Sequence, residues 1–240
     1  IGYKIKNNMS IRTEMGFSNF HRNLYSSIGN KQNLGYAYMI QANRQDSLPR
    51  NLIIQNSVQY EYKSENFQQV EQYRNVEFTR DWNIINQSNK TEHIARYQTL
   101  LIDTKHNIQT GYKFSTFIRQ QVYKGFENWV TFSTNYKNLK INADARILST
   151  QDSLNKSRFF RPSVFAQYSI AKARGLSFAV GFSQENNQFK NRNTNELQSN
   201  SYKNNNASFQ MSLPHSAKWN FSLTYKYRKD IETKNAAFKD

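Results

Sequence analysis

Hydrophobic and polar residues alternate one by one along most of the chain. In one clear stretch, the residues Ile108, Thr110, Tyr112, Phe114, Thr116 and Ile118 alternate with Gln109, Gly111, Lys113 and Ser115. In another, Trp219, Phe221, Leu223, Tyr225 and Tyr227 alternate with Asn220, Ser222, Thr224, Lys226 and Arg228. A period of two is typical of β-strands with one apolar and one polar face. We therefore predict an all-β protein.

The alternating stretches define eleven candidate strands. They cover 1–19, 33–44, 51–63, 75–85, 93–103, 107–122, 129–148, 158–170, 175–184, 206–213 and 218–229. Many exceed the usual length of about 5–6 residues and approach the roughly 9–11 residues that cross a bilayer at a tilt. Within 129–148 the parity changes near Asn138, which either a β-bulge or a tight hairpin would produce. The count of eleven treats this stretch as one bulged strand.

The connections between these strands are unequal in length. Short turns are expected at 46–50, 171–175 and 214–218, and longer polar connections at 64–74, 149–157 and 185–205. Long alternating strands with short turns on one side and longer loops on the other describe an antiparallel up-and-down transmembrane β-barrel. We treat 1–240 as a single barrel domain or barrel segment, with the short turns on the periplasmic side.

The strand count predicts that these residues are part of a larger barrel. Bacterial single-chain barrels have an even number of strands, and an unpaired strand edge is very costly in lipid. We expect the missing strands to come from a longer chain or from another subunit. The chain also begins at Ile1 without Met or a signal sequence, which fits a processed product or a piece of a longer protein.

Composition agrees with a barrel that has a polar interior. Only 37% of the residues are hydrophobic, while 15% are aromatic. Aromatic girdles at the lipid–water boundary explain the high share of aromatic residues, and a water-lined interior explains the low share of hydrophobic residues. We expect the following side chains to face lipid: Tyr112, Phe114, Phe178, Val180, Phe221 and Leu223. The chain has no Cys, which excludes disulfides and Cys-ligated metals, and no apolar run reaches the roughly 18 residues of a membrane helix.

A soluble or surface-anchored β-sandwich that binds carbohydrate or a protein partner is the alternative, because its strands alternate as well. Against it, the polar faces here are strongly charged and the strands are uniformly long. Solubility without detergent would distinguish the two classes.

The net charge of +16 is spread along the whole chain. This distribution argues against a nucleic-acid surface, which gathers its cations on one element. On the polar parity we expect these basic side chains to face the lumen: Lys113, Arg119, Lys140, Arg146, Lys226 and Arg228. Acidic residues share that parity, so the interior is either a satisfied network of mixed charge or a cationic lining that favours anions.

Two further groups of residues are candidates for contacts at the membrane surface. Arg80 lies on the apolar parity next to Trp82, and mid-membrane it would cost about 2–4 kcal/mol. We therefore expect Arg80 and Trp82 at a membrane interface, a lipid phosphate or a protein contact. The Asn-rich loop 185–205 is the first candidate for external recognition, and we expect Lys190, Arg192 and Lys203 to face lipid headgroups and lipopolysaccharide.

Signals for catalysis and for cofactors are absent from the sequence. The four His residues are scattered, and no nucleotide-binding, nucleophile-elbow or zinc-protease motif occurs. Some outer-membrane enzymes use a Ser–His pair, to which His21 or His93 could contribute, but no spacing selects a nucleophile. We predict that the protein is not an enzyme and needs no cofactor.

Three segments carry a resemblance to a known group of proteins. They are Val76–Asn83, Phe159–Pro162 and the Asn- and Tyr-rich strand Trp219–Arg228, and they resemble the barrel regions of large outer-membrane proteins from Bacteroidota. The resemblance implies a place in the bacterial outer membrane and a role in transport, protein export or envelope assembly. It implies as partners the outer-membrane lipids, lipopolysaccharide, and other envelope proteins or missing parts of the same barrel.

Overall fold

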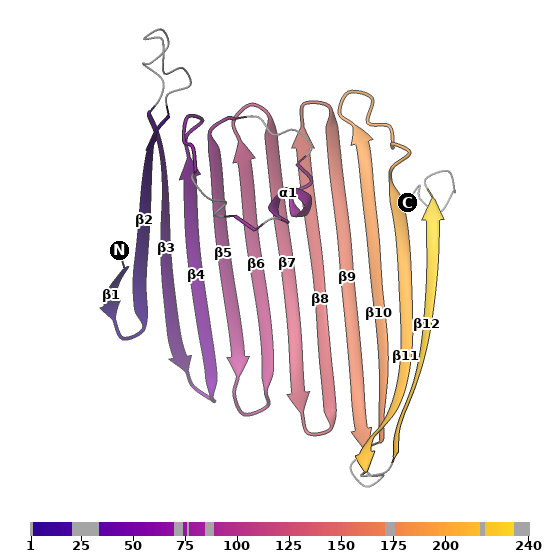
Figure 1. Cartoon of the computed structure of the whole chain (residues 1–240). Coiled ribbons are helices and arrows are strands. Elements are labelled where there is room, and N and C mark those ends of the chain that lie inside the picture. The colour runs from indigo at the N-terminus through magenta and orange to yellow at the C-terminus, as the bar shows by residue number, and fades with distance from the viewer. Residues whose placement is uncertain are drawn as a thin grey trace.

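Each strand pairs with the next one along the chain, and the result is a single sheet of twelve antiparallel strands in sequence order. The computed structural model describes residues 2–20, 34–69, 74–75, 77–84, 89–170, 176–216 and 219–232. The strands are β1 (Gly2–Lys6), β2 (Met9–Asn19), β3 (Leu34–Leu48), β4 (Leu52–Lys63), β5 (Glu92–Asp103), β6 (Ile108–Arg119), β7 (Tyr123–Tyr136), β8 (Leu139–Asp152), β9 (Asn155–Ile170), β10 (Leu176–Asn191), β11 (Tyr202–Ser216) and β12 (Trp219–Glu232). The prediction of an all-β, up-and-down antiparallel architecture is confirmed (Figure 1).

The sheet is open. Among the described residues β1 pairs only with β2, and β12 only with β11, so these two strands form its lateral edges. The turns 7–8, 49–51, 104–107 and 137–138 gather at one end, called the lower end after its place in Figure 1. The described parts of the β4–β5 connection and the connections 120–122, 153–154 and 192–201 gather at the other, upper end.

The register separates the side chains into two faces. Lys113 stands opposite Trp129 on one face of β6 and β7, and Tyr112 stands opposite Val130 on the other. We call the first the polar face and the second the apolar face. All six candidates for lipid contact lie on the apolar face, and all six basic candidates for the lumen lie on the polar face.

The predicted strand 75–85 is wrong. Its described part forms the single helical turn α1 (Phe78–Asp81), which lies over the polar face of β6 and β7 (Figure 1). Alternation of apolar residues here also suits a helical turn, because residues four apart such as Phe78 and Trp82 share one side of it. Both rings contact Phe117 of β6.

Two predicted strands are in fact hairpins, and with the loss of the predicted strand 75–85 the count is twelve and not eleven. The stretch 129–148 turns at Lys137 and Asn138, and Lys137 has the left-handed φ of 53° that such tight turns use. The stretch 1–19 turns at 7–8. The predicted connection 149–157 shrinks to 153–154, and the predicted loop 185–205 shrinks to 192–201 because β10 and β11 continue into it.

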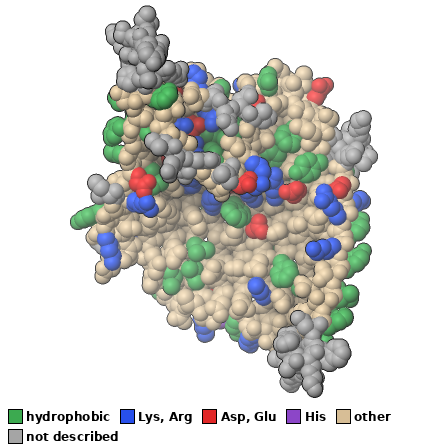
Figure 2. Space-filling view, in the orientation of Figure 1, with side chains coloured by type: hydrophobic (Ala, Val, Ile, Leu, Met, Phe, Trp, Pro, Cys, Tyr) green, Lys and Arg blue, Asp and Glu red, His purple; other side chains and the backbone are tan. Residues whose placement is uncertain are grey.

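The small hydrophobic core lies on the polar face beneath α1. It consists of Trp82, Ile94, Phe117, Tyr123, Leu148 and Phe159, with Phe78, Ile84 and Phe189 packed against it. By contrast, large side chains of the apolar face stand exposed, such as Val180 at 55% and Leu223 at 52%. Figure 2 views the polar face: hydrophobic side chains are scattered over it, and charged ones gather near α1.

Candidate functional site

A segment of the β4–β5 connection crosses the upper part of the polar face. We call its described residues, 64–69, 74–75 and 77–84, the strap. Its start is held by two hydrogen bonds to β3: the Ser64 amide donates to the Tyr36 carbonyl and the Tyr36 amide donates to Ser64 Oγ, both at 2.9 Å. The Gln68 amide donates to Ser18 Oγ of β2, also at 2.9 Å. The strap thus begins flat against the sheet.

Glycines in the strands make room for the strap. A Cβ on Gly35 would lie 2.3 Å from the backbone nitrogen of Phe67, and one on Gly16 would lie 3.3 Å from the Phe67 ring. Further along, a Cβ on Gly125 would lie 2.8 Å from the Trp82 ring. A larger residue at Gly35 or Gly125 would collide with the strap, and one at Gly16 would press on the Phe67 ring. Glycines at these strand positions therefore mark the close approach of another segment.

An ion-pair cluster holds the middle of the strap. Arg74 pairs at 2.5 Å with both Glu61 of β4 and Glu92 of β5. Glu92 also accepts from Arg119 of β6 at 2.7 Å, and Arg96 lies 3.7 Å from Glu61. The Glu92 side chain is 4% exposed and that of Arg74 15%. Breaking a pair as buried as this one leaves an uncompensated charge and costs about 3–5 kcal/mol.

Aromatic packing holds the end of the strap. Phe78 and Trp82 lie edge-on to Phe117 at centroid distances of 5.3 and 5.8 Å. The Tyr123 hydroxyl donates to the Trp82 carbonyl, and the Arg74 guanidinium lies 4.7 Å above the Phe78 ring. The strap is therefore tied to β2, β3, β4, β5, β6 and β7 by contacts of different kinds.

Most of the basic lumen candidates are paired with carboxylates. Glu127, which is 2% exposed, pairs with Lys113 at 3.4 Å and with Arg146. Arg119 pairs with Glu92 as described, and Arg228 pairs with Asp230 at 2.9 Å. Lys140 and Lys226 form no ion pair within the part of the chain that the structure describes. Mixed-charge pairing thus accounts for four of these six cations.

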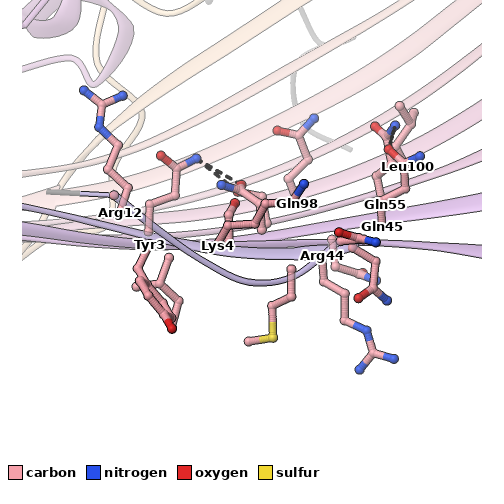
Figure 3. A pocket seen from close by; sticks show the side chains of 18 of the residues that line it. Tyr3, Lys4, Arg12, Arg44, Gln45, Gln55, Gln98 and Leu100 are labelled. Atoms are coloured by element: carbon pink, nitrogen blue, oxygen red, sulfur yellow. Dashed lines mark hydrogen bonds between the residues drawn. The ribbon is translucent and has the colours of Figure 1, made fainter.

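A hollow of about 1060 Å³ lies at the lower end of β1–β5. On the polar face it is lined mainly by amides and hydroxyls: Ser10, Gln41, Asn43, Gln45, Ser47, Gln55, Ser57 and Gln98. Figure 3 shows Arg12, Gln55 and Gln98 projecting from one side of the sheet and Tyr3 and Arg44 from the other. Neutral donors and acceptors suit water and uncharged polar solutes.

The remaining candidates occupy different surroundings. Arg80 lies in α1, pairs with Glu77 at 2.8 Å and has a side chain 74% exposed, while Trp82 is a core residue. Neither lies on a strand, because the segment that carries them forms α1 and the turn after it. Lys190 and Lys203 lie on β10 and β11, and Arg192, in the following connection, donates to the Asp152 carbonyl at 3.3 Å.

No catalytic or metal-binding group stands out in the described ranges. They contain no cluster of three or more His, Asp or Glu side chains placed to hold a metal. His93 shares a 2.7 Å hydrogen bond with Tyr60 on the apolar face, and His106 pairs with Asp103 at 2.6 Å in a turn. His21 lies outside the described residues. The helical part of the described chain is too short to cross a membrane.

The strap and its attachment residues were missed at the sequence level. The signals were Gly16 and Gly35 on the polar parity of their strands, and Glu61 and Glu92 at neighbouring strand ends. Comparison with protein-family models, with curated proteins and with solved structures finds no match to this chain.

Proposed function

We propose that the sheet is part of the wall of a bacterial outer-membrane β-barrel that serves in transport, protein export or envelope assembly and does no covalent chemistry. In this proposal the apolar face contacts lipid and the polar face lines an aqueous interior. The strap narrows that interior near the upper end. The proposal also takes the upper end as external, because the long β4–β5 and β10–β11 connections lie there and every described turn at the lower end is short.

The observation that carries the proposal is a continuous apolar band on one face of the sheet. On every strand of β3–β12 the band contains a run of apolar or hydroxyl side chains. Examples are Leu34, Tyr36, Tyr38, Ile40 and Ala42 on β3; Leu139, Ile141, Ala143, Ala145 and Ile147 on β8; Leu176, Phe178, Val180 and Phe182 on β10; and Phe221, Leu223, Tyr225 and Tyr227 on β12. Polar or charged residues bound the band, such as Arg44 below it on β3 and Gln184 above it on β10.

The band runs obliquely across the strands. Phe182 is the top of the band on β10. The line of cross-strand partners that starts at Phe182 crosses seven strand spacings and ends at Asp46 on β3. The band on β3 reaches Leu34, which lies twelve residues further up the strand. At ~3.4 Å per residue and ~4.8 Å per strand spacing, this offset corresponds to strands tilted by about 50° from the normal of the band.

This tilt supports a membrane-spanning sheet over a soluble one. Strands of transmembrane barrels tilt by about 35–45°, and a lipid layer imposes a flat band whatever the direction of the strands. A soluble sandwich buries its apolar face against a second sheet, but the described chain forms one sheet. Left in water, so large a contiguous apolar surface would be unusual for a monomer.

The proposal is tested with single-cysteine labels, since the chain has no Cys of its own. Val180→Cys on the apolar face and Gln210→Cys on the polar face of the adjacent strand are a matched pair of exposed positions. In the full-length protein reconstituted into liposomes, we expect brominated acyl chains to quench a fluorophore at residue 180 and to spare one at residue 210. Equal quenching at both positions, or a full-length protein that stays in solution without detergent, would instead favour the β-sandwich.

A further inference from the structure

Four cations gather on the apolar face at the upper end of β7–β10. Lys156 of β9 and Lys190 of β10 are direct cross-strand partners. Arg158 is the next residue on the same face of β9, and Lys124 of β7 lies on the same line of paired residues, through Gln151 of β8. We call Lys124, Lys156, Arg158 and Lys190 the basic cluster.

The basic cluster lacks acidic partners within the described part of the chain, where no ion pair involves any of its members. Glu127, three residues after Lys124, lies on the polar face and pairs with Lys113 and Arg146. Asp152, four residues before Lys156, accepts the amides of Leu154 and Asn155 at 2.7 and 2.6 Å. Like charges placed directly opposite one another across two strands are destabilising. The pair Lys156–Lys190 therefore stores a repulsion that a bound anion would relieve.

The cluster is a local feature and not a consequence of the net charge alone. On the apolar face of β3–β6, the corresponding upper positions are Tyr38, Tyr62, His93 and Ile118. At the lower end of that face, charges are matched: Arg44 pairs with Asp46 at 2.7 Å, and His106 pairs with Asp103. Unmatched cations on neighbouring strands thus concentrate above the band, directly next to Phe126 on β7 and Phe160 on β9, while on β10 three polar residues of this face separate Lys190 from Phe182.

The position of the cluster selects an amphipathic anion. Immediately below it, on the same face, lie Phe126 of β7, which is 44% exposed, and Phe160 of β9, followed by Val164, which is 43% exposed. An anion bound by the cluster would extend any attached acyl chain over these side chains. A free inorganic anion would gain nothing from them.

We propose that the basic cluster binds the phosphate-bearing headgroup of a lipid in the surrounding leaflet, with the acyl chains lying along Phe126, Phe160 and Val164. This inference rests on the proposed function, because it needs the apolar face to meet lipid. Arg158 supplies a planar fork that matches phosphate geometry, and the three lysines supply point charges. The ligand is recognised by phosphate next to hydrocarbon, which distinguishes it from a soluble phosphate ester.

The experiment is a lipid titration of the full-length protein in neutral detergent, followed by native mass spectrometry. The probes are an acylated glucosamine disaccharide carrying two phosphates, the same lipid without phosphates, and inorganic phosphate. We compare the double variant Lys156→Gln/Lys190→Gln with Lys140→Gln/Lys226→Gln, which removes the same charge from the polar face. Each cation near a headgroup contributes about fivefold to affinity, so the first double variant should lose about 25-fold and the control should lose little.

Three results would overturn the inference. The first is an equal loss of binding in both double variants. The second is that the lipid without phosphates binds at the same concentrations as the phosphorylated lipid, and the third is that inorganic phosphate at those concentrations displaces the phosphorylated lipid completely.

Thermal unfolding gives a second readout, in which Lys190→Gln should shift the unfolding midpoint in opposite directions with and without the lipid. Without phosphorylated lipid, Lys190→Gln should raise the unfolding midpoint, because it removes repulsion from Lys156; with the lipid, it should lower the midpoint relative to the parent protein. A midpoint that falls in both conditions would contradict a lipid site. If label quenching at residue 180 shows contact with acyl chains while these measurements fail, only this inference is lost and the proposed function stands.

Discussion

The backbone of Phe67 lies directly on Gly35, so closely that a Cβ on Gly35 would be 2.3 Å from the Phe67 nitrogen. Gly35 belongs to β3 and faces the polar side, and Phe67 belongs to the strap. This contact places the strap against the wall of the sheet and not in the solvent above it. Because the contact is between backbones, no change of rotamer can relieve a collision there.

Replacing Gly35 with Val should therefore destabilise the protein by about 1–3 kcal/mol, the usual cost of forcing extra atoms into a packed site. Ala42→Val, on the opposite face of the same strand, is the control and should change stability by less than about 0.5 kcal/mol. Denaturant unfolding of the reconstituted full-length protein measures both values. Equal stability of the two variants would show that the strap does not rest on Gly35.

The Arg74 ion pairs should keep the strap closed over Ile94, which is 1% exposed. In an Ile94→Cys background, Arg74→Gln should speed modification of the thiol by about tenfold or more, because opening the strap no longer breaks a buried charge cluster. Arg80→Gln is a matched change in the same strap at an exposed ion pair, where little stability is at stake. Similar rates in the two variants would contradict this role of Arg74.

A charge placed in the apolar band should block folding into a bilayer. Val180→Arg should cost about 2–4 kcal/mol if the residue lies near the membrane midplane, which lowers the folded fraction seen as heat-modifiable migration on gels. Gln210→Arg on the polar face of β11 should be tolerated. Ser115 and Ser177 also face the polar side, but they are only 1% and 6% exposed and make poor controls. Equal damage at residues 180 and 210 would indicate a core on both faces.

The cations without ion pairs should dominate any anion preference of the interior. In the full-length protein reconstituted in planar bilayers, Lys140→Gln/Lys226→Gln should shift the reversal potential in a salt gradient toward that of a non-selective pore, since a cationic lining concentrates anions. Arg146→Gln removes the same kind of charge but leaves the buried Glu127 with one partner fewer, so its main effect should be lower stability. An unchanged reversal potential in the double variant would contradict a cationic lining.

The two edge strands should pair with further strands in the intact assembly. Unpaired backbone groups cost several kcal/mol each in hydrocarbon, so the amides on the free edge of β12 should exchange slowly with deuterium in the full-length protein in liposomes. In the 240-residue chain alone, the same amides should exchange rapidly. Fast exchange in both samples would show that the β12 edge meets water.

The hairpins illustrate what alternation does and does not reveal. At 137–138 the turn pairs Tyr136 with Leu139, which exchanges the parity of the two strands, so the sequence shows a break near Asn138. At 7–8 the turn pairs Lys6 with Met9, but an irregularity between Lys4 and Lys6 restores the parity. The first hairpin therefore leaves a signal in the sequence, and the second is hidden.

The sequence by itself determined the all-β class, the up-and-down order and the face to which nearly every strand residue points, because a period of two is a local property of an extended chain. Only the tertiary structure decided that the strap crosses the polar face and that Arg74 meets Glu61 and Glu92. The tertiary structure also decided that Lys156 stands opposite Lys190. These relationships depend on strand register and on contacts between distant segments. Register is set by pairing energies summed over whole strands, so no short stretch of residues determines it.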